Sequence, residues 1–175
     1  MNALALLPFT LAQLQPSFDS VLEQLGRIEV TWPVSQRTMS YRTIDNTTGQ
    51  PEAGVRFKSL NIAKGANGFF MYGSLYLMCK DRQIHAFGKT FGHNPRASTV
   101  PLTLTWDKGA SERKPWTFTN DGYVRSMNPR SFLNMASKHN TLTVTWKEYG
   151  GKQHMLYFDL RSGREGLKAV AATCR

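Results

Sequence analysis

The side chains with the strongest capacity for chemistry in this sequence are two cysteines and four histidines. Cys79 and Cys174 are the only cysteines, and they do not form the Cys-x-x-Cys pairs that hold zinc. The histidines occur singly, without a His-x-x-x-His pair or a carboxylate–His cluster. They are His85, His93, His139 and His154. The sequence therefore predicts no metal site and no cofactor.

Catalytic motifs are absent as well. Neither a Gly-x-Ser-x-Gly elbow nor a complete Gly-x-x-x-x-Gly-Lys-Ser/Thr phosphate loop occurs. Asp107, Asp121 and Asp159 stand where turns or strand ends are expected, which explains them more simply than a catalytic role. We therefore expect no catalytic residue and a protein that is not an enzyme.

The net charge of +10 is unevenly distributed along the chain. Residues 1–79 contain six Lys/Arg and five Asp/Glu, whereas residues 80–175 contain sixteen and seven, so the two parts carry +1 and +9. A basic half indicates an anionic partner, such as nucleic acid, a lipid surface or an acidic protein face. The alternative is that excess charge only keeps a β-rich protein soluble.

Several cations of the basic half lie in or beside predicted loops. Our candidates for binding an anion or a partner are Lys80, Arg82, Lys89, Arg113, Lys114 and Arg125. Aromatic residues are interleaved with them, namely Phe87, Phe91, Trp116 and Tyr123. Cations and rings in this arrangement can follow a nucleic-acid backbone and stack its bases. Rings in a β core and cations on a solvated surface are the alternative interpretation.

The elements that must position these residues are mainly strands. Apolar and polar residues alternate over 54–62, 100–106 and 115–119. Two hairpins are predicted, one from 75–79 and 83–87 with a three-residue loop and one from 141–146 and 155–160. Beyond the N-terminal 27 residues, helical spacing is confined to short stretches at 131–136 and 164–174. These patterns favour a mainly β protein with an antiparallel β-sandwich-like domain over residues 75–175.

The first 27 residues form an apolar N-terminal arm and helix in this interpretation. Charged residues begin only at Asp19, so the basic start of a secretory signal is missing. We expect the arm to dock on its own domain or on a neighbour through Leu4, Leu6, Leu7, Phe9 and Leu11. A weak or remnant signal is the alternative. Residues 28–74 would supply strands and loops that lead into the core, including the loop-like stretch 45–54.

The order of short motifs over residues 75–175 resembles the C-terminal domain of the VasI (TagO) family, accessory proteins of type VI secretion. The motifs are the Leu-x-Leu-x-Cys strand ending at Cys79, Trp106-Asp107, Trp116 before Thr119-Asn120-Asp121-Gly122, Phe132-Leu133, Tyr149-Gly150, Phe158-Asp159-Leu160, Gly163, Gly166-Leu167 and Cys174. Residues 1–70 are not covered by the resemblance. The resemblance implies a Cys79–Cys174 disulfide and no catalytic residues.

That disulfide would close a loop long enough to stabilise the fold by roughly 4–5 kcal/mol in the chain-entropy model. Two separate buried thiols are the alternative, and in a reducing cytosol the cysteines would remain thiols. The family resemblance implies a periplasmic or envelope location. The missing basic start favours a virion or the cytoplasm instead, as for a phage-borne relative.

We expect a structural or adaptor protein that docks into a larger assembly, either a phage virion or a secretion machine. Its partners would be proteins in a multi-subunit assembly, and a homo-oligomer is one form of it. The alternative function is a nucleic-acid-binding module or inhibitor that uses the basic C-terminal half. No stretch approaches the roughly 20 apolar residues that cross a bilayer.

Overall fold

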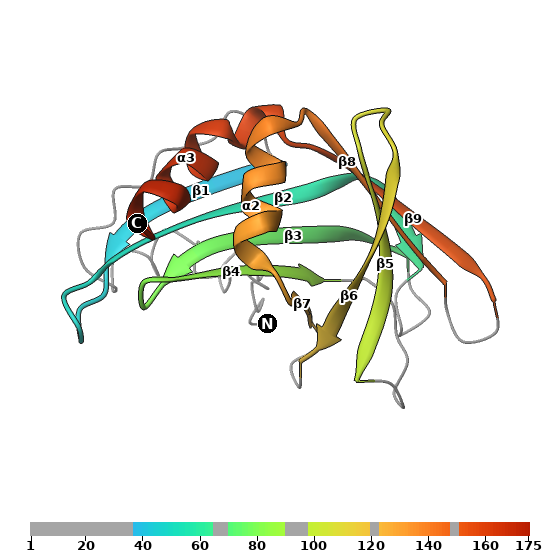
Figure 1. Cartoon of the computed structure of the whole chain (residues 1–175). Helices are drawn as coiled ribbons and strands as arrows, with labels where there is room; N and C mark the ends of the chain where they lie inside the picture. The colour runs from blue at the N-terminus through green and yellow to red at the C-terminus, as the bar shows by residue number, and fades with distance from the viewer. Residues whose placement is uncertain (1–36, 65–69, 90–97, 120–122, 148–150) are drawn as a thin grey trace, which may run out of the picture.

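Nine antiparallel strands form one sheet that curls into a half-barrel, and short helices pack on its concave side (Figure 1). This computed structural model describes residues 37–64, 70–89, 98–119, 123–147 and 151–175. The strands follow the order β1-β2-β3-β4-β7-β6-β5-β8-β9 across the sheet. The prediction of a mainly β, antiparallel fold with a C-terminal helix is confirmed. The predicted arm and helix at 1–27 lie outside the described residues.

The helices and strands have the following bounds. The strands are β1 (Thr38–Ile44), β2 (Pro51–Lys64), β3 (Phe70–Lys80), β4 (Gln83–Lys89), β5 (Thr99–Trp106), β6 (Ser111–Phe118), β7 (Tyr123–Ser126), β8 (Thr141–Lys147) and β9 (Gln153–Asp159). The helices are α2 (Pro129–Lys138) and α3 (Arg164–Thr173), and the 3-10 turn η1 (Arg161–Gly163) precedes α3. Strands β1 and β2 pair into the same sheet as the rest, so residues 38–64 share its core.

Alternating side chains divide each strand between the core and the outer face. On β5, Val100, Leu102, Leu104 and Trp106 are buried, while the Thr and Pro residues between them face outward. Successive side chains of a strand point to opposite faces, so one row of four enters the core. Full burial of an aliphatic side chain such as Leu stabilises the fold by roughly 1.5–3 kcal/mol. The period-two patterns in the sequence therefore identify the core-facing positions.

The β3–β4 hairpin is tighter than the sequence predicts. Lys80 pairs with Gln83, so the loop contains two residues rather than the expected three. These residues, Asp81 and Arg82, have φ angles of 51° and 58°. Positive φ at both central positions is typical of the type I′ turn, whose twist matches that of paired strands. The expectation was wrong because Lys80, a polar residue, continues the ladder.

The N-terminal part of the sheet is larger than the sequence indicates. Strand β1 was not predicted, and β2 begins at Pro51, inside the stretch 45–54 that was expected to be loop. The Asp45 carboxylate accepts hydrogen bonds from the backbone N–H groups of Thr47 and Thr48, at 2.8 and 2.7 Å. This side-chain capping closes the turn within a few residues. The remaining residues of the stretch are therefore free to pair.

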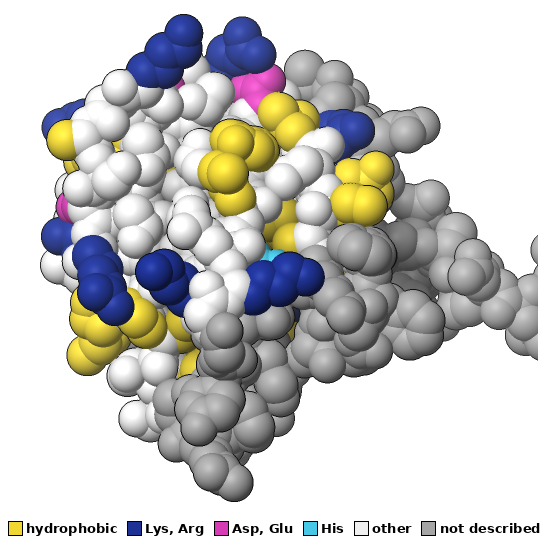
Figure 2. Space-filling model, turned by 90° about the vertical axis from the view of Figure 1, so that its right-hand side faces the viewer, with side chains coloured by type: hydrophobic (Ala, Val, Ile, Leu, Met, Phe, Trp, Pro, Cys, Tyr) yellow, Lys and Arg dark blue, Asp and Glu magenta, His cyan; other side chains and the backbone are white. Residues whose placement is uncertain are grey.

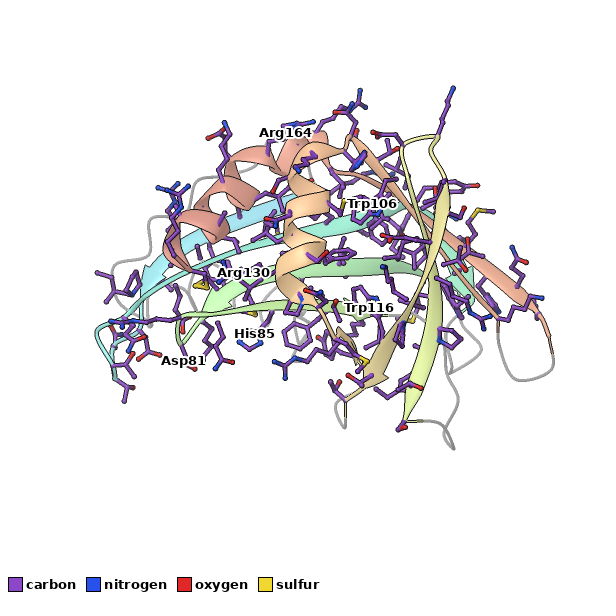
Figure 3. All side chains as sticks on the ribbon, viewed as in Figure 1. Asp81, His85, Trp106, Trp116, Arg130 and Arg164 are labelled. Carbon is purple, nitrogen blue, oxygen red and sulfur yellow. A yellow bond between two sulfur atoms is a disulfide. The ribbon has the colours of Figure 1, made fainter. Side chains whose placement is uncertain are left out.

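Helix α2 anchors the aromatic part of the core. Its first turn is capped by the Asn128 side chain, which accepts a hydrogen bond from the Ser131 N–H, and Pro129 occupies the first helical position. Phe132 on the buried face lies 5.3 Å from the ring of Trp106 and 5.2 Å from that of Trp116. Both tryptophans point into the space between α2 and the strands (Figure 3).

A polar side chain links β2 to β9 where the sheet curls back on itself. Strand β1 pairs with β2 only as far as Phe57, and beyond it β9 approaches the same edge of β2 (Figure 1). There the amide of Asn61 donates to the Met155 carbonyl and accepts from the Tyr157 N–H, both at 2.8 Å. Both partners are backbone groups of β9, so the Asn61 amide takes the place of the hydrogen bonds that a paired strand would make there. We call this junction the β2–β9 seam.

Cys79 and Cys174 form a disulfide that joins the end of β3 to the residue after α3, 95 positions away. Both residues are buried in the core. The bond links the last helix to an interior strand of the sheet, and in the chain-entropy model it restricts a long loop of the unfolded chain. The seam and the disulfide therefore hold the sheet at two separate places.

Replacing Asn61 by Ala should lower the free energy of unfolding by about 1–2 kcal/mol, since two hydrogen bonds are lost. Urea denaturation followed by tryptophan fluorescence measures the change. Asn134→Ala, on the exposed side of α2, is the matched control and should leave stability nearly unchanged. Equal stability of the two variants would contradict a closing role for Asn61.

Removing the disulfide with the double variant Cys79→Ala, Cys174→Ala should lower the free energy of unfolding by about 2–5 kcal/mol. Urea denaturation with and without a reducing agent provides the measurement. The reductant should destabilise the wild-type protein and have no effect on the double variant. A wild-type denaturation midpoint that does not change with the reductant would show that the disulfide does not contribute to stability.

Candidate binding surface on the convex face of the sheet

Aromatic rings gather on the outer face of three neighbouring strands. Tyr76 on β3 is opposite Phe87 on β4, and Tyr123 on β7 is paired with Lys89 of β4. The ring of Tyr123 lies 5.9 Å from that of Tyr76 and 6.4 Å from that of Phe87, in edge-to-face geometry. All three side chains are half-buried. The outer face of an antiparallel sheet is usually polar, so this grouping is unexpected there.

Two cations lie over these rings. The Lys89 ammonium is 5.5 Å from the centroid of Tyr123, and the Arg125 guanidinium is 5.9 Å from that of Phe87. Both distances are in the range of cation–π attraction. We call the six residues of this group the cation–aromatic cluster, which consists of Tyr76, His85, Phe87, Lys89, Tyr123 and Arg125.

His85 fixes the position of Arg125 within the cluster. Its ring stacks on Phe87 at 5.8 Å, and its Nδ1 accepts a hydrogen bond of 3.1 Å from Nη2 of Arg125. Burial, followed by the positive charge of Arg125, lowers the pKa of His85. The neutral imidazole is therefore favoured, and it is the form that accepts from a guanidinium. His85 lies on the side of β4 that faces away from α2 (Figure 3).

A second ring with cations lies farther along β3. Tyr72 is 41% exposed, and Nζ of Lys58 lies 4.3 Å from its ring centroid. The Arg37 guanidinium is 5.6 Å from the same centroid and also donates to the Ser59 carbonyl at 2.9 Å. Tyr72 and Tyr76 are four residues apart on one strand, so they share its outer face. The surface therefore extends from β7 across β4 and β3 to β2.

The outer positions of β3, β4, β6 and β7 carry cations without acids, whereas Glu52 stands on the outer face of β2 beside Lys80. Over the described parts of β3, β4, β7 and β6 the outward residues are Tyr72, Ser74, Tyr76, Met78, Lys80, Gln83, His85, Phe87, Lys89, Tyr123, Arg125, Ser111, Arg113, Pro115 and Thr117. No Asp or Glu is among these described positions. The side of the molecule at the β2–β9 seam likewise shows hydrophobic side chains among several Lys and Arg and few acids (Figure 2).

The six predicted anion-binding residues fall into three places. Lys89 and Arg125 come together in the cation–aromatic cluster. Lys80 and Arg82 lie at the β3–β4 hairpin, where Lys80 is 3.8 Å from the Glu52 carboxylate. Arg113 and Lys114 are adjacent on β6 and so point to opposite faces, and Lys114 forms an ion pair of 3.0 Å with Glu112. Of the six, only Lys89 and Arg125 therefore belong to the cation–aromatic cluster.

Sequence reasoning missed part of this surface. The residues not predicted are Tyr72, Tyr76, Lys58 and His85. Alternation along β3 nevertheless places both tyrosines on the face of the strand that points away from the buried Leu75 and Leu77. Among the interleaved aromatics, Trp116 is a core residue with 1% exposure. Phe91 and the arm residues Leu4, Leu6, Leu7, Phe9 and Leu11 lie outside the described residues.

Asp107 is a turn residue that links two neighbouring strands, β5 and β8. Its Oδ1 accepts hydrogen bonds from the N–H groups of Asn140 and Thr141, both at 2.9 Å, and its Oδ2 accepts one from Nδ1 of His139 at 2.9 Å. The hydrogen bond from His139, followed by that from Thr141, lowers the pKa of Asp107 to about 2. The carboxylate thus ties the end of β5 to the start of β8.

Stability should depend on pH through Asp107. Its folded pKa of about 2 is below the usual 3.8, so its contribution is complete above pH 5 or so and is lost as the pH falls towards 2. In urea denaturation at several pH values, Asp107→Asn should show a smaller loss of stability over this range than the wild type. Asp81→Asn, in the exposed β3–β4 turn, is the control and should follow the wild type. Identical pH profiles for all three proteins would contradict the assignment.

Comparison with known proteins yields no relative of this chain. No protein-family model matches it, and no curated protein or solved structure is significantly similar. The resemblance to the VasI family therefore stays a prediction. Within the described residues no group of three His, Cys, Asp or Glu could hold a metal ion. No helix in the same part of the chain is long and apolar enough to cross a membrane.

Proposed function

We propose that the protein is a non-enzymatic adaptor that docks on an anionic partner within a larger assembly through the convex face of its sheet. The observation that carries the proposal is the cation–aromatic cluster on outward positions of β3, β4 and β7. Tyrosine and arginine are the residue types enriched at interfaces, because each combines a large apolar contact area with hydrogen-bonding groups.

The charge of this face supports an anionic partner. Residues 80–175 carry +9 of the net charge of +10, and the described outward positions of β3, β4, β6 and β7 carry no carboxylate. A surface of one sign attracts an oppositely charged partner and accelerates the encounter. The rings supply apolar area that becomes buried on contact.

The rigidity of the face supports docking as well. Its residues lie on paired strands, and His85 holds the Arg125 side chain in place through the bond to Nδ1. Side chains that are already ordered lose less conformational entropy when a partner binds. The sequence favours a phage particle or a secretion machine as the assembly, and we include this assignment in the same proposal.

Binding of the purified full chain to immobilised poly-L-glutamate tests the adaptor proposal. The double variant Lys89→Ser, Arg125→Ser should bind at least about tenfold more weakly than the wild type at roughly 50 mM salt. The matched control, Lys108→Ser with Lys138→Ser, removes the same charge from exposed positions elsewhere and should bind within about twofold of the wild type. Equal binding of the two double variants would refute the convex face as the docking site.

A further inference from the structure

We infer that the convex face binds single-stranded nucleic acid, with its rings stacking bases and its cations contacting phosphates. This inference rests on the proposed function, because it names the anionic partner of the same face. The surface that would bind comprises the cation–aromatic cluster and the neighbouring group of Tyr72 with Lys58. We call it the ring–cation track.

Three rings of the track each lie beside a cation. Lys58 lies 4.3 Å from the centroid of Tyr72, Lys89 5.5 Å from that of Tyr123, and Arg125 5.9 Å from that of Phe87. A nucleotide has the matching composition, one planar base and one anionic phosphate. Proteins that bind single strands combine aromatic stacking platforms with a positive surface that follows the backbone. Repeated ring–cation pairs therefore correspond to consecutive nucleotides.

The spacing of the rings allows them to contact different bases. Tyr72 and Tyr76 lie four residues apart on β3, which is roughly 13 Å along an extended strand. Tyr123 is reached next, at 5.9 Å from Tyr76 across the sheet. A row that runs along β3 and then across the sheet to β7 requires an elongated ligand, and a single-stranded chain of bases has this form.

The chemistry of the face favours a single strand over two other polyanions. A duplex keeps its bases stacked inside, so exposed rings would gain no base contacts from it. An acidic protein segment would satisfy the cations, but carboxylates do not require a row of planar rings. Outward rings on adjacent strands of an antiparallel sheet are a known platform for unpaired bases.

Fluorescence anisotropy with the full chain and a labelled oligothymidylate of about 12 nucleotides tests the inference. The wild type should bind this probe at least about tenfold more tightly than a duplex of the same length. Affinity should fall steeply between about 50 and 200 mM salt because phosphates release counterions when they are neutralised.

Ring-removing variants make the test specific. Tyr72→Leu and Tyr123→Leu keep an apolar residue on the strand and should each weaken oligothymidylate binding about tenfold, as expected for the loss of one stacked base. The matched controls Tyr72→Phe and Tyr123→Phe keep the ring and should bind within about twofold of the wild type. Binding of poly-L-glutamate should be the same for all four variants. Thermal unfolding monitored by circular dichroism establishes that each variant is folded.

The outcomes separate the inference from the adaptor proposal. If the Leu variants bind oligothymidylate as tightly as the Phe variants, or the duplex binds as tightly as the single strand, base stacking is refuted. If poly-L-glutamate binds through Lys89 and Arg125 while oligothymidylate does not bind, the partner is an acidic protein and only the nucleic-acid inference fails. If neither probe depends on Lys89 and Arg125, both proposals fail.

Discussion

The two hydrogen bonds of the Asn61 amide to the backbone of β9 hold together strands that lie far apart in the order of the sheet. Without them the Met155 carbonyl and the Tyr157 N–H of β9 would lose their hydrogen bonds to β2. Because the amide satisfies both a donor and an acceptor of β9, the last strand can return to the second strand. This contact defines the curl, and the curl separates a concave face from a convex one.

The concave face depends on that curl because the helices must fit inside it. Trp106, Trp116 and Phe132 fill the space between α2 and the strands. Helix α3 approaches β1 and β2 where glycine leaves room, since a Cβ on Gly166 would lie 2.9 Å from the Cβ atoms of Ser40 and Val55. Such a distance is shorter than side chains tolerate, and glycine has no Cβ. The disulfide then fastens the end of α3 to β3.

The convex face carries the outward-pointing side chains of the same strands, which do not enter the core. Rings there remain partly covered by one another and by the cations above them, which reduces the cost of exposing them to water. The same contacts hold the rings in fixed positions. A face of this kind is stable in the free protein and still offers apolar area and positive charge to a partner. The core that stabilises the fold and the proposed binding surface thus lie on opposite faces of the same strands.

Local patterns in the sequence determined the elements and the inward or outward direction of their side chains. Alternation over 100–106 identified β5 and its four buried residues, and helical spacing over 131–136 identified the central part of α2. These features could be predicted because strand and helix periodicities depend on neighbouring residues. The length of the β3–β4 loop could not, since it depends on the pairing of Lys80 with Gln83.

Only the tertiary structure decided which outward residues meet. Lys89 and Arg125 were both recognisable as basic candidates, but they are 36 positions apart and become neighbours because β4 pairs with β7. Tyr72 and Lys58 likewise depend on the pairing of β2 with β3. Strand order and register are set by the packing of the whole sheet, to which distant residues contribute. The sequence by itself therefore determined a basic, mainly β protein and its core-facing positions, and the curl and pairing of its sheet assembled outward rings and cations into one surface.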